Sequence, residues 1–165
     1  MTTSVLIHVV ISLVGIASGF VVLFGLLAGR RLDRWTSLFL TTTVLTSATG
    51  FFLPAHKILP SHIIGAISLV VLAFAIYARY SRQLVGGWRL TYVVTSTLAL
   101  YFNVFVLVVQ SFMKIPALKA LAPTQSEPPF AIAQGLVLLL FIVLGTGAVK
   151  KFRIPPVHIA ALASR

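Results

Sequence analysis

The sequence predicts an all-α integral membrane protein with five transmembrane helices. Of its 165 residues, 59% are hydrophobic and only 9% are charged, and the mean hydropathy is +1.06. Soluble domains are about 45–50% apolar and about 25% charged. A soluble domain of this length would need far more charged surface to cover its core, so the composition excludes that class.

Five apolar stretches are long enough to cross a bilayer, whose core of about 30 Å needs about 20 helical residues. The expected spans are about 4–28, 36–53, 62–79, 90–113 and 130–149. The second is the least apolar because threonines recur along it. We expect residues 1–153 to form a single transmembrane domain and residues 154–165 to form a cytoplasmic tail.

The basic residues predict how the chain is oriented, because Lys and Arg collect in cytoplasmic loops. With five spans, all 13 basic residues except Lys57, Lys114 and Lys119 lie on one side of the membrane. Without the second span they would divide almost evenly. This favours a bacterial inner-membrane protein with its N-terminus outside and its C-terminus in the cytoplasm.

The net charge of +11 could also indicate nucleic-acid binding. The basic residues, however, sit in short clusters between apolar runs, which is the arrangement of membrane loops, so nucleic acid is not an expected partner. The expected partner is the lipid bilayer, with other membrane subunits or self-association left open.

The first two spans resemble the next two. Each pair begins near a histidine (His8 or His62), carries arginine and then tryptophan (Trp35 or Trp88) at its turn, and continues into a helix with several Ser or Thr residues. The pattern predicts two parallel helical hairpins from an internal duplication, with the fifth helix added. Parallel repeats of this kind occur in transporters.

Three of the four histidines are expected at the outer face: His8, His56 and His62. Imidazole binds haem iron, zinc and copper, and it exchanges protons near neutral pH. His8 and His62, on different helices at matched depth, would suit a bis-imidazole haem b. The same three histidines could instead hold a metal ion, and they could equally be ordinary interfacial residues.

Other small and polar residues within or beside the apolar runs are candidates for lining a site or packing helices together, because polar groups at membrane depth usually face the bundle interior. Asn103 is expected to bond to the threonines of the second span, for example Thr46 or Thr49, and Ser126 or Glu127 is expected to cap the fifth helix. The full candidate set is Ser12, Gly15, Gly19, Thr46, Asn103, Gln110, Gln134 and Glu127.

The chemistry open to the chain is narrow. It has two carboxylates, Asp33 and Glu127, and no cysteine, which excludes thiol catalysis, disulfides and paired-carboxylate hydrolysis. It carries no nucleotide-binding or hydrolase motif. The hypothesis is a redox-linked membrane subunit that binds haem b, a metal or quinone through its outer histidines. The alternatives are a non-catalytic accessory or scaffold subunit and a small transporter with Asn103, Gln110 and Gln134 along its path.

Overall fold

The computed structural model describes residues 3–52 and 60–153, and this part of the chain is helical throughout, without strands. The elements are α1 (Thr3–Leu27), α2 (Asp33–Gly50), α3 (Pro60–Ile76), the π-helical turn η1 (Tyr77–Ser81) that continues α3, α4 (Trp88–Lys114), the short α5 (Pro116–Leu121) and α6 (Pro128–Lys151). Each expected span therefore corresponds to a helix, with bounds that differ by a few residues.

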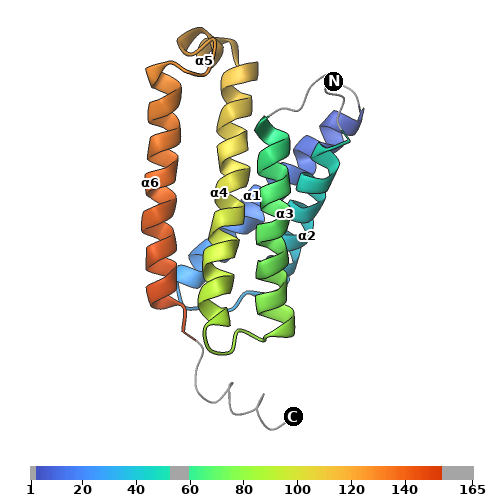
Figure 1. Cartoon of the computed structure of the whole chain (residues 1–165), viewed down its shortest axis with the longest axis vertical. Coiled ribbons are helices and arrows are strands. Elements are labelled where there is room, and N and C mark those ends of the chain that lie inside the picture. The colour runs from blue at the N-terminus through green and yellow to red at the C-terminus, as the bar shows by residue number, and fades with distance from the viewer. Residues whose placement is uncertain (1–2, 53–59, 154–165) are drawn as a thin grey trace.

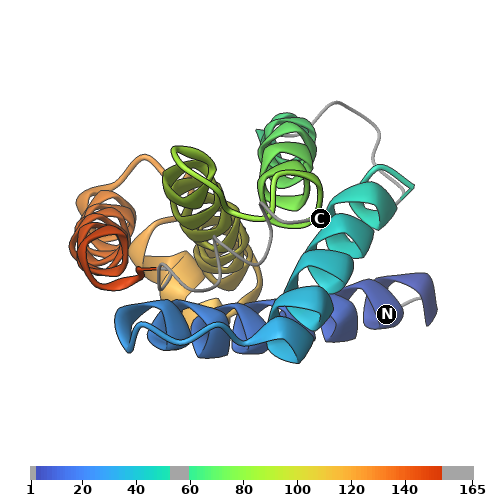
Figure 2. The ribbon, with the colours of Figure 1, turned by 90° about the horizontal axis from the view of Figure 1, so that it is seen from below.

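The helices form a bundle in which α1 runs obliquely (Figure 1). Helices α3, α4 and α6 lie along the long axis, and Figure 2 shows them nearly end-on while α1 crosses beneath them. Helix α1 packs on α2, α4 and α6, so it reaches from one side of the bundle to the other. The short α5 lies at the top, between the end of α4 and the start of α6 (Figure 1).

Four helical segments in the described part of the chain are long and apolar enough to cross a membrane: Thr3–Leu27, His62–Ser81, Trp88–Lys114 and Pro128–Lys151. This fits a small multi-span membrane protein. Helix α2 is not among the four, so the five-span count is not established. The reason is compositional, since its 18 residues include repeated threonines that lower its hydropathy.

The polar side chains of α2 bond to three neighbouring helices inside the bundle. Four of its hydroxyls have a partner on another helix, which offsets part of the cost of holding polar groups away from water. The pairs are Thr36 with Tyr92 (3.2 Å), Thr43 with Asn103 (3.2 Å), Ser47 with Ser68 (3.3 Å) and Thr49 with His8 (2.9 Å). The residues that dilute the hydropathy of α2 thus hold it against α1, α3 and α4.

The two ends of the bundle carry different residues. We call one the arginine end; its basic residues are Arg30, Arg31, Arg34, Arg79, Arg82, Arg89, Lys150, Lys151 and Arg153. The opposite end, where α1 and α3 begin and α4 finishes, is called the histidine end. Almost the whole buried apolar core lies in the arginine half of the bundle, built from residues such as Leu23, Phe39, Leu72, Leu100 and Phe152.

A buried arginine ties the loops of the arginine end together. Arg79, only 2% exposed, donates to the Asp33 carboxylate at the start of α2. Its guanidinium also lies over the Tyr92 ring, 5.1 Å from the centroid. Arg31 bonds to the same carboxylate at 3.0 Å. The expected pairing of Asp33 with its sequence neighbours is therefore only half of the arrangement, because η1 brings Arg79 to it from α3.

The two expected hairpins correspond to α1 with α2 and α3 with α4, and the helices of each pair pack against each other. Helix α1 is oblique, whereas α3 follows the long axis (Figure 2). The internal duplication and its two parallel hairpins stay a prediction.

Candidate functional site

A partly open cavity of about 350 Å³ lies at the histidine end and is lined by α1, α2, α3 and α4. Its volume is within the range of about 300–1,000 Å³ that is usual for small-molecule sites. Its wall is mostly apolar, with a few polar side chains among them. The apolar lining includes Val5, Val9, Leu13, Ile16, Phe51, Ile64, Phe102, Val106, Leu107 and Ile115.

The cavity gathers most of the polar residues that the sequence singled out. Six of them line it: His8, Ser12, Thr46, His62, Asn103 and Gln110. They come from four different helices. The spacing of residues within a single helix therefore could not predict that they line the same cavity. His56 lies outside the described residues.

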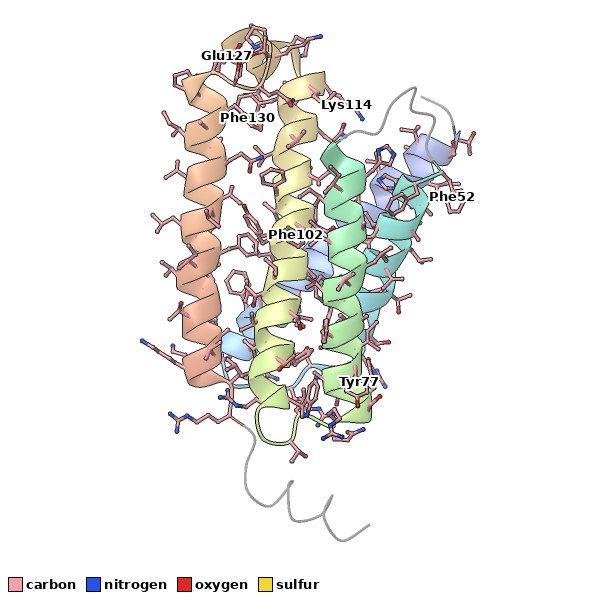
Figure 3. All side chains as sticks on the ribbon, viewed as in Figure 1. Phe52, Tyr77, Phe102, Lys114, Glu127 and Phe130 are labelled. Atoms are coloured by element: carbon pink, nitrogen blue, oxygen red, sulfur yellow. The ribbon has the colours of Figure 1, made fainter. Side chains whose placement is uncertain are left out.

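Lys114 also lines the cavity and supplies its only charged side chain among the described lining residues. It lies at the upper end of α4, whereas Phe102 lies about halfway down the same helix (Figure 3). Lys114 was not among the candidates, although it continues the spacing of Asn103 and Gln110 by one further turn. No carboxylate belongs to the described wall, so Lys114 gives the cavity a positive charge at its upper end, and uncharged polar side chains are spread along the rest of the wall.

His8 is held by α2 in a defined tautomer. Its Nδ1 lies 2.9 Å from the Thr49 hydroxyl oxygen, and the Thr49 hydroxyl donates to the Leu45 carbonyl at 2.6 Å. Because that hydroxyl has only one proton to donate, directing it at Leu45 assigns His8 Nδ1–H as the donor to Thr49. The neutral imidazole then keeps an unprotonated Nε2, which is the atom available to accept a proton or to bind a metal.

His62 approaches the same cavity from the first turn of α3. Its ring packs on Phe51, with 5.8 Å between the centroids. In the described part of the chain no three His, Cys, Asp or Glu side chains come close enough to hold a metal ion. The three-histidine metal site is thus without support, since only His8 and His62 of the three are described.

Asn103 bonds to α2 as expected, but to a different threonine. Its Nδ2 donates to the Thr43 hydroxyl at 3.2 Å, one turn away from Thr46. A methyl group at Gly15 would lie 3.4 Å from that hydroxyl and 3.7 Å from Asn103 Nδ2, which is ordinary van der Waals contact, so α1 packs closely beside the pair. The Thr46 hydroxyl is buried at the cavity wall without a partner.

Gly19 contributes to packing and does not line the cavity. An added methyl group would stand 2.5 Å from Leu100 Cδ1 and 2.8 Å from the Phe39 ring, which is closer than carbon atoms can approach. The absence of a side chain therefore allows α1 to cross α2 and α4 at short range, as small residues do in other membrane bundles.

Gln134 lies outside the cavity, between α4 and α6. Its Nε2 donates to the Phe105 carbonyl at 3.2 Å, and its Oε1 is buried without a partner. Gln134 therefore does not share the cavity wall with Asn103 and Gln110, and a transport path along the three residues stays a prediction. Neither does Glu127 line the cavity.

Glu127 precedes α6, but its carboxylate does not cap that helix. It accepts hydrogen bonds from the backbone and hydroxyl of Thr124 (3.1 and 2.9 Å) and from the Ser126 N–H (3.1 Å). Capping side chains bond to the second or third N–H of a helix, and the first two residues of α6 are prolines, which have no N–H. Desolvation raises the pKa of Glu127, but the bonds from Thr124 and Ser126 lower it more, so its pKa is below the ordinary value.

Comparison with known proteins gives no assignment: no family model, no curated protein and no solved structure matches this chain. The cavity is therefore the main structural evidence for a function. Four long apolar helices fit a small membrane protein.

Proposed function

We propose that this protein is a redox-linked membrane subunit that holds a quinone in the cavity at its histidine end. The observation that carries the proposal is the composition of the wall, which is apolar along most of its surface and has hydrogen-bonding groups from α1, α3 and α4. An isoprenoid quinone has the matching construction, with a carbonyl-bearing ring on an apolar chain. A cavity mostly apolar with a few placed polar groups is also the usual form of a small-molecule site.

The polar groups suit both redox states of such a ligand. Lys114 and the Gln110 amide can donate hydrogen bonds to a quinone carbonyl oxygen. His8 Nε2 is an acceptor, because Nδ1 carries the proton, and it can receive a hydrogen bond from a quinol hydroxyl. A site with both kinds of group can bind the ligand before and after reduction.

The test uses protein purified in mild detergent, with quinone measured in a solvent extract and by titration of a short-chain benzoquinone against thermal stability. We expect retained quinone and a rise in Tm that saturates. Ser12→Phe places a ring in the cavity and should abolish both signals. Val10→Phe is the matched control, because Val10 is 52% exposed on the outer face of α1 and should leave binding unchanged. A wild-type protein without retained quinone and without a Tm response would overturn the proposal.

The head-group contacts have their own variants. Gln110→Leu removes one hydrogen bond of about 0.5–1.5 kcal/mol, so binding should weaken by up to about tenfold. Gln134→Leu removes the same kind of side chain outside the cavity and should leave the affinity unchanged. Equal losses in the two variants would mean that the ligand is not in this cavity.

A second candidate is haem b, favoured by the two histidines that line one cavity from α1 and α3. Because Nδ1 of His8 bonds to Thr49, Nε2 is the nitrogen left to bind iron. Metal-binding histidines commonly use their other ring nitrogen in a hydrogen bond of this kind. An absorption spectrum separates the candidates. A Soret band that disappears in both His8→Ala and His62→Ala would support haem, and a colourless protein that retains quinone would support the first proposal.

The membrane arrangement belongs to the same proposal. We infer that α2 crosses the membrane with the other helices, since its polar side chains are bonded inside the bundle. The five crossings would place the arginine end in the cytoplasm of a bacterial cell and the histidine end outside, by the distribution of basic residues. Cysteine introduced at Lys119 or at Lys150 should then react with a membrane-impermeant reagent in intact cells only at Lys119.

A further inference from the structure

The arginine end contains a group of exposed cations that the quinone proposal does not use. They are Arg30 in the turn after α1, Lys150 and Lys151 at the end of α6, and Arg153 just beyond it, all of them exposed. Nitrogen-tipped side chains gather at the lower end of the bundle in Figure 3. We call these four residues the basic cluster.

The fold brings the basic cluster together from the ends of the first and last helices, α1 and α6. Gly29 turns the chain with φ +68°, and a methyl group there would lie 3.4 Å from the Lys151 carbonyl oxygen. One turn back in α6, a methyl group at Gly147 would lie 2.9 Å from Leu27 Cδ2. The end of α1 thus rests directly on the end of α6, which places Arg30 beside Lys150 and Lys151.

No described protein carboxylate is left for the basic cluster. Asp33, the acidic residue of this end, is bonded by Arg31 and by the buried Arg79. The carbonyl oxygens at the end of α6 are also occupied, because Arg89 donates to those of Val149 and Phe152. The four exposed cations have no anionic partner among the described residues. They would therefore attract a ligand that carries negative charge.

Aromatic residues place this end at the level of lipid headgroups. Trp35, Tyr77 and Tyr80 are between 45% and 48% exposed on the outside of the same end. Tryptophan and tyrosine are enriched at the membrane–water boundary, where their rings lie among the headgroups. The cations of the basic cluster are therefore at a depth that phospholipid phosphates reach.

We propose that the basic cluster is a binding site for the headgroup of an anionic phospholipid, held between the turn after α1 and the end of α6. Basic groups between transmembrane helices bind phosphate-rich headgroups in this way, and each cation near the surface contributes on the order of 1 kcal/mol. The site is independent of the cavity, which lies at the other end of the bundle.

The test reconstitutes the full chain in nanodiscs of phosphatidylcholine mixed equally with phosphatidylglycerol and counts the lipids that the protein retains by native mass spectrometry. We expect the wild type to retain phosphatidylglycerol in preference. Lys150→Gln combined with Lys151→Gln should lower that preference by on the order of 30-fold, which corresponds to two lost phosphate contacts. Arg34→Gln combined with Arg82→Gln is the matched control at the same end, and it should retain the preference.

Two further arms identify the source of the negative charge. Inorganic phosphate and a short DNA duplex, each added to protein in phosphatidylcholine alone, should give no saturable binding that depends on Lys150 and Lys151. Binding of either with lipid-like affinity would overturn the assignment to a phospholipid, as would equal losses in the two double variants. Failure of quinone binding would leave this result untouched, since the two sites share no residue.

Discussion

At the arginine end the helices enclose a continuous apolar core, whereas at the histidine end four of the same helices line a partly open cavity of about 350 Å³. In the packed half, large side chains such as Phe39, Leu100 and Phe152 fill the space between helices. In the hollow half, the cavity wall combines large apolar residues with small or polar ones such as Ser12, Gly65 and Ser68. The difference indicates that stability resides mainly in one half and leaves the other free to bind a ligand.

The two halves also differ in how their charged side chains are compensated. In the packed half, Arg79 is buried with Asp33 and Tyr92 as partners, so its charge is compensated within the protein. In the hollow half, the wall that Lys114 lines has no carboxylate among its described residues. Buried hydroxyls without a described partner occur in both halves, Thr46 in the hollow one and Ser96 and Thr97 in the packed one. Buried polar groups that lack partners are costly, and natural proteins keep them where a water molecule or ligand completes them.

The largest difference between the halves should come from removing the charge that compensates Arg79. Asp33→Asn leaves a buried guanidinium without its counter-ion, which should lower the free energy of unfolding by about 2–3 kcal/mol. Arg31→Gln is the control, because Arg31 bonds to the same oxygen from a more exposed position and should cost less than about 1 kcal/mol. Denaturant unfolding in detergent measures both. Equal costs would mean that the stabilising effect of Asp33 does not come from compensating the charge of the buried Arg79.

Close helix contact in the packed half should make Gly19 sensitive. Gly19→Ala forces a methyl group against Leu100 and Phe39, and overpacking of this kind costs about 1–3 kcal/mol. Gly15→Ala, at the border of the cavity, meets its nearest atom at 3.2 Å and should cost less. Gly135→Ala has open space and should be neutral or slightly stabilising. The order of the three unfolding free energies tests the comparison, and a Gly15→Ala cost as large as that of Gly19→Ala would contradict it.

Thr43 and Thr46 lie one turn apart on α2, and only the Thr43 hydroxyl has a hydrogen-bond partner on another helix among the described residues. Thr43→Val removes the acceptor of Asn103 and should cost about 1 kcal/mol, because the amide loses a partner inside the bundle. Thr46→Val removes a hydroxyl that has no partner and should leave the ligand-free protein within about 0.5 kcal/mol of the wild type. If Thr46→Val weakens quinone binding while its unfolding is unchanged, the hydroxyl serves the ligand. A cost for Thr46→Val equal to that of Thr43→Val would show that both are structural.

The smallest effect should be a pH dependence at the turn before α6. Because the folded pKa of Glu127 is lowered, its hydrogen bonds stabilise the turn above the ordinary pKa of 4.5 and are lost as the pH falls through the folded value. Amide hydrogen exchange at Thr124 and Ser126 should therefore accelerate on acidification below pH 4.5, after correction for intrinsic rates. Glu127→Gln should remove that pH dependence. An unchanged profile in the variant would assign the effect to another group.

Much of the fold could be predicted from the sequence because it follows from local composition. The long apolar runs appear as helices close to the expected bounds, and the segment before the fifth helix contains the short α5. Helix α2 was the difficult element to predict, because its threonines lower its hydropathy. Only the tertiary structure shows how they are accommodated, since Thr36, Thr43 and Thr49 bond to side chains on other helices.

The candidate site was predictable in its residue types and not in its arrangement. His8, Asn103 and Gln110 were expected to face the bundle interior, and they line one cavity. Gln134 was grouped with them but lies between α4 and α6, because α6 packs on α1 and α4 outside the four helices that line the cavity. Lys114 was expected only as one of the outer basic residues, although the spacing of Asn103 and Gln110 extends to it.

The sequence by itself determined that this is a helical membrane protein with its basic residues at one end and histidines at the other, because hydropathy and charge placement are properties of composition along the chain. Only the tertiary structure decided that Arg79 reaches Asp33, that Asn103 pairs with Thr43, and that His8 and His62 share a cavity. Each of these depends on the relative depth and crossing angle of helices far apart in sequence. Those are set by how glycines and large side chains fit together, and local periodicity does not encode that fit.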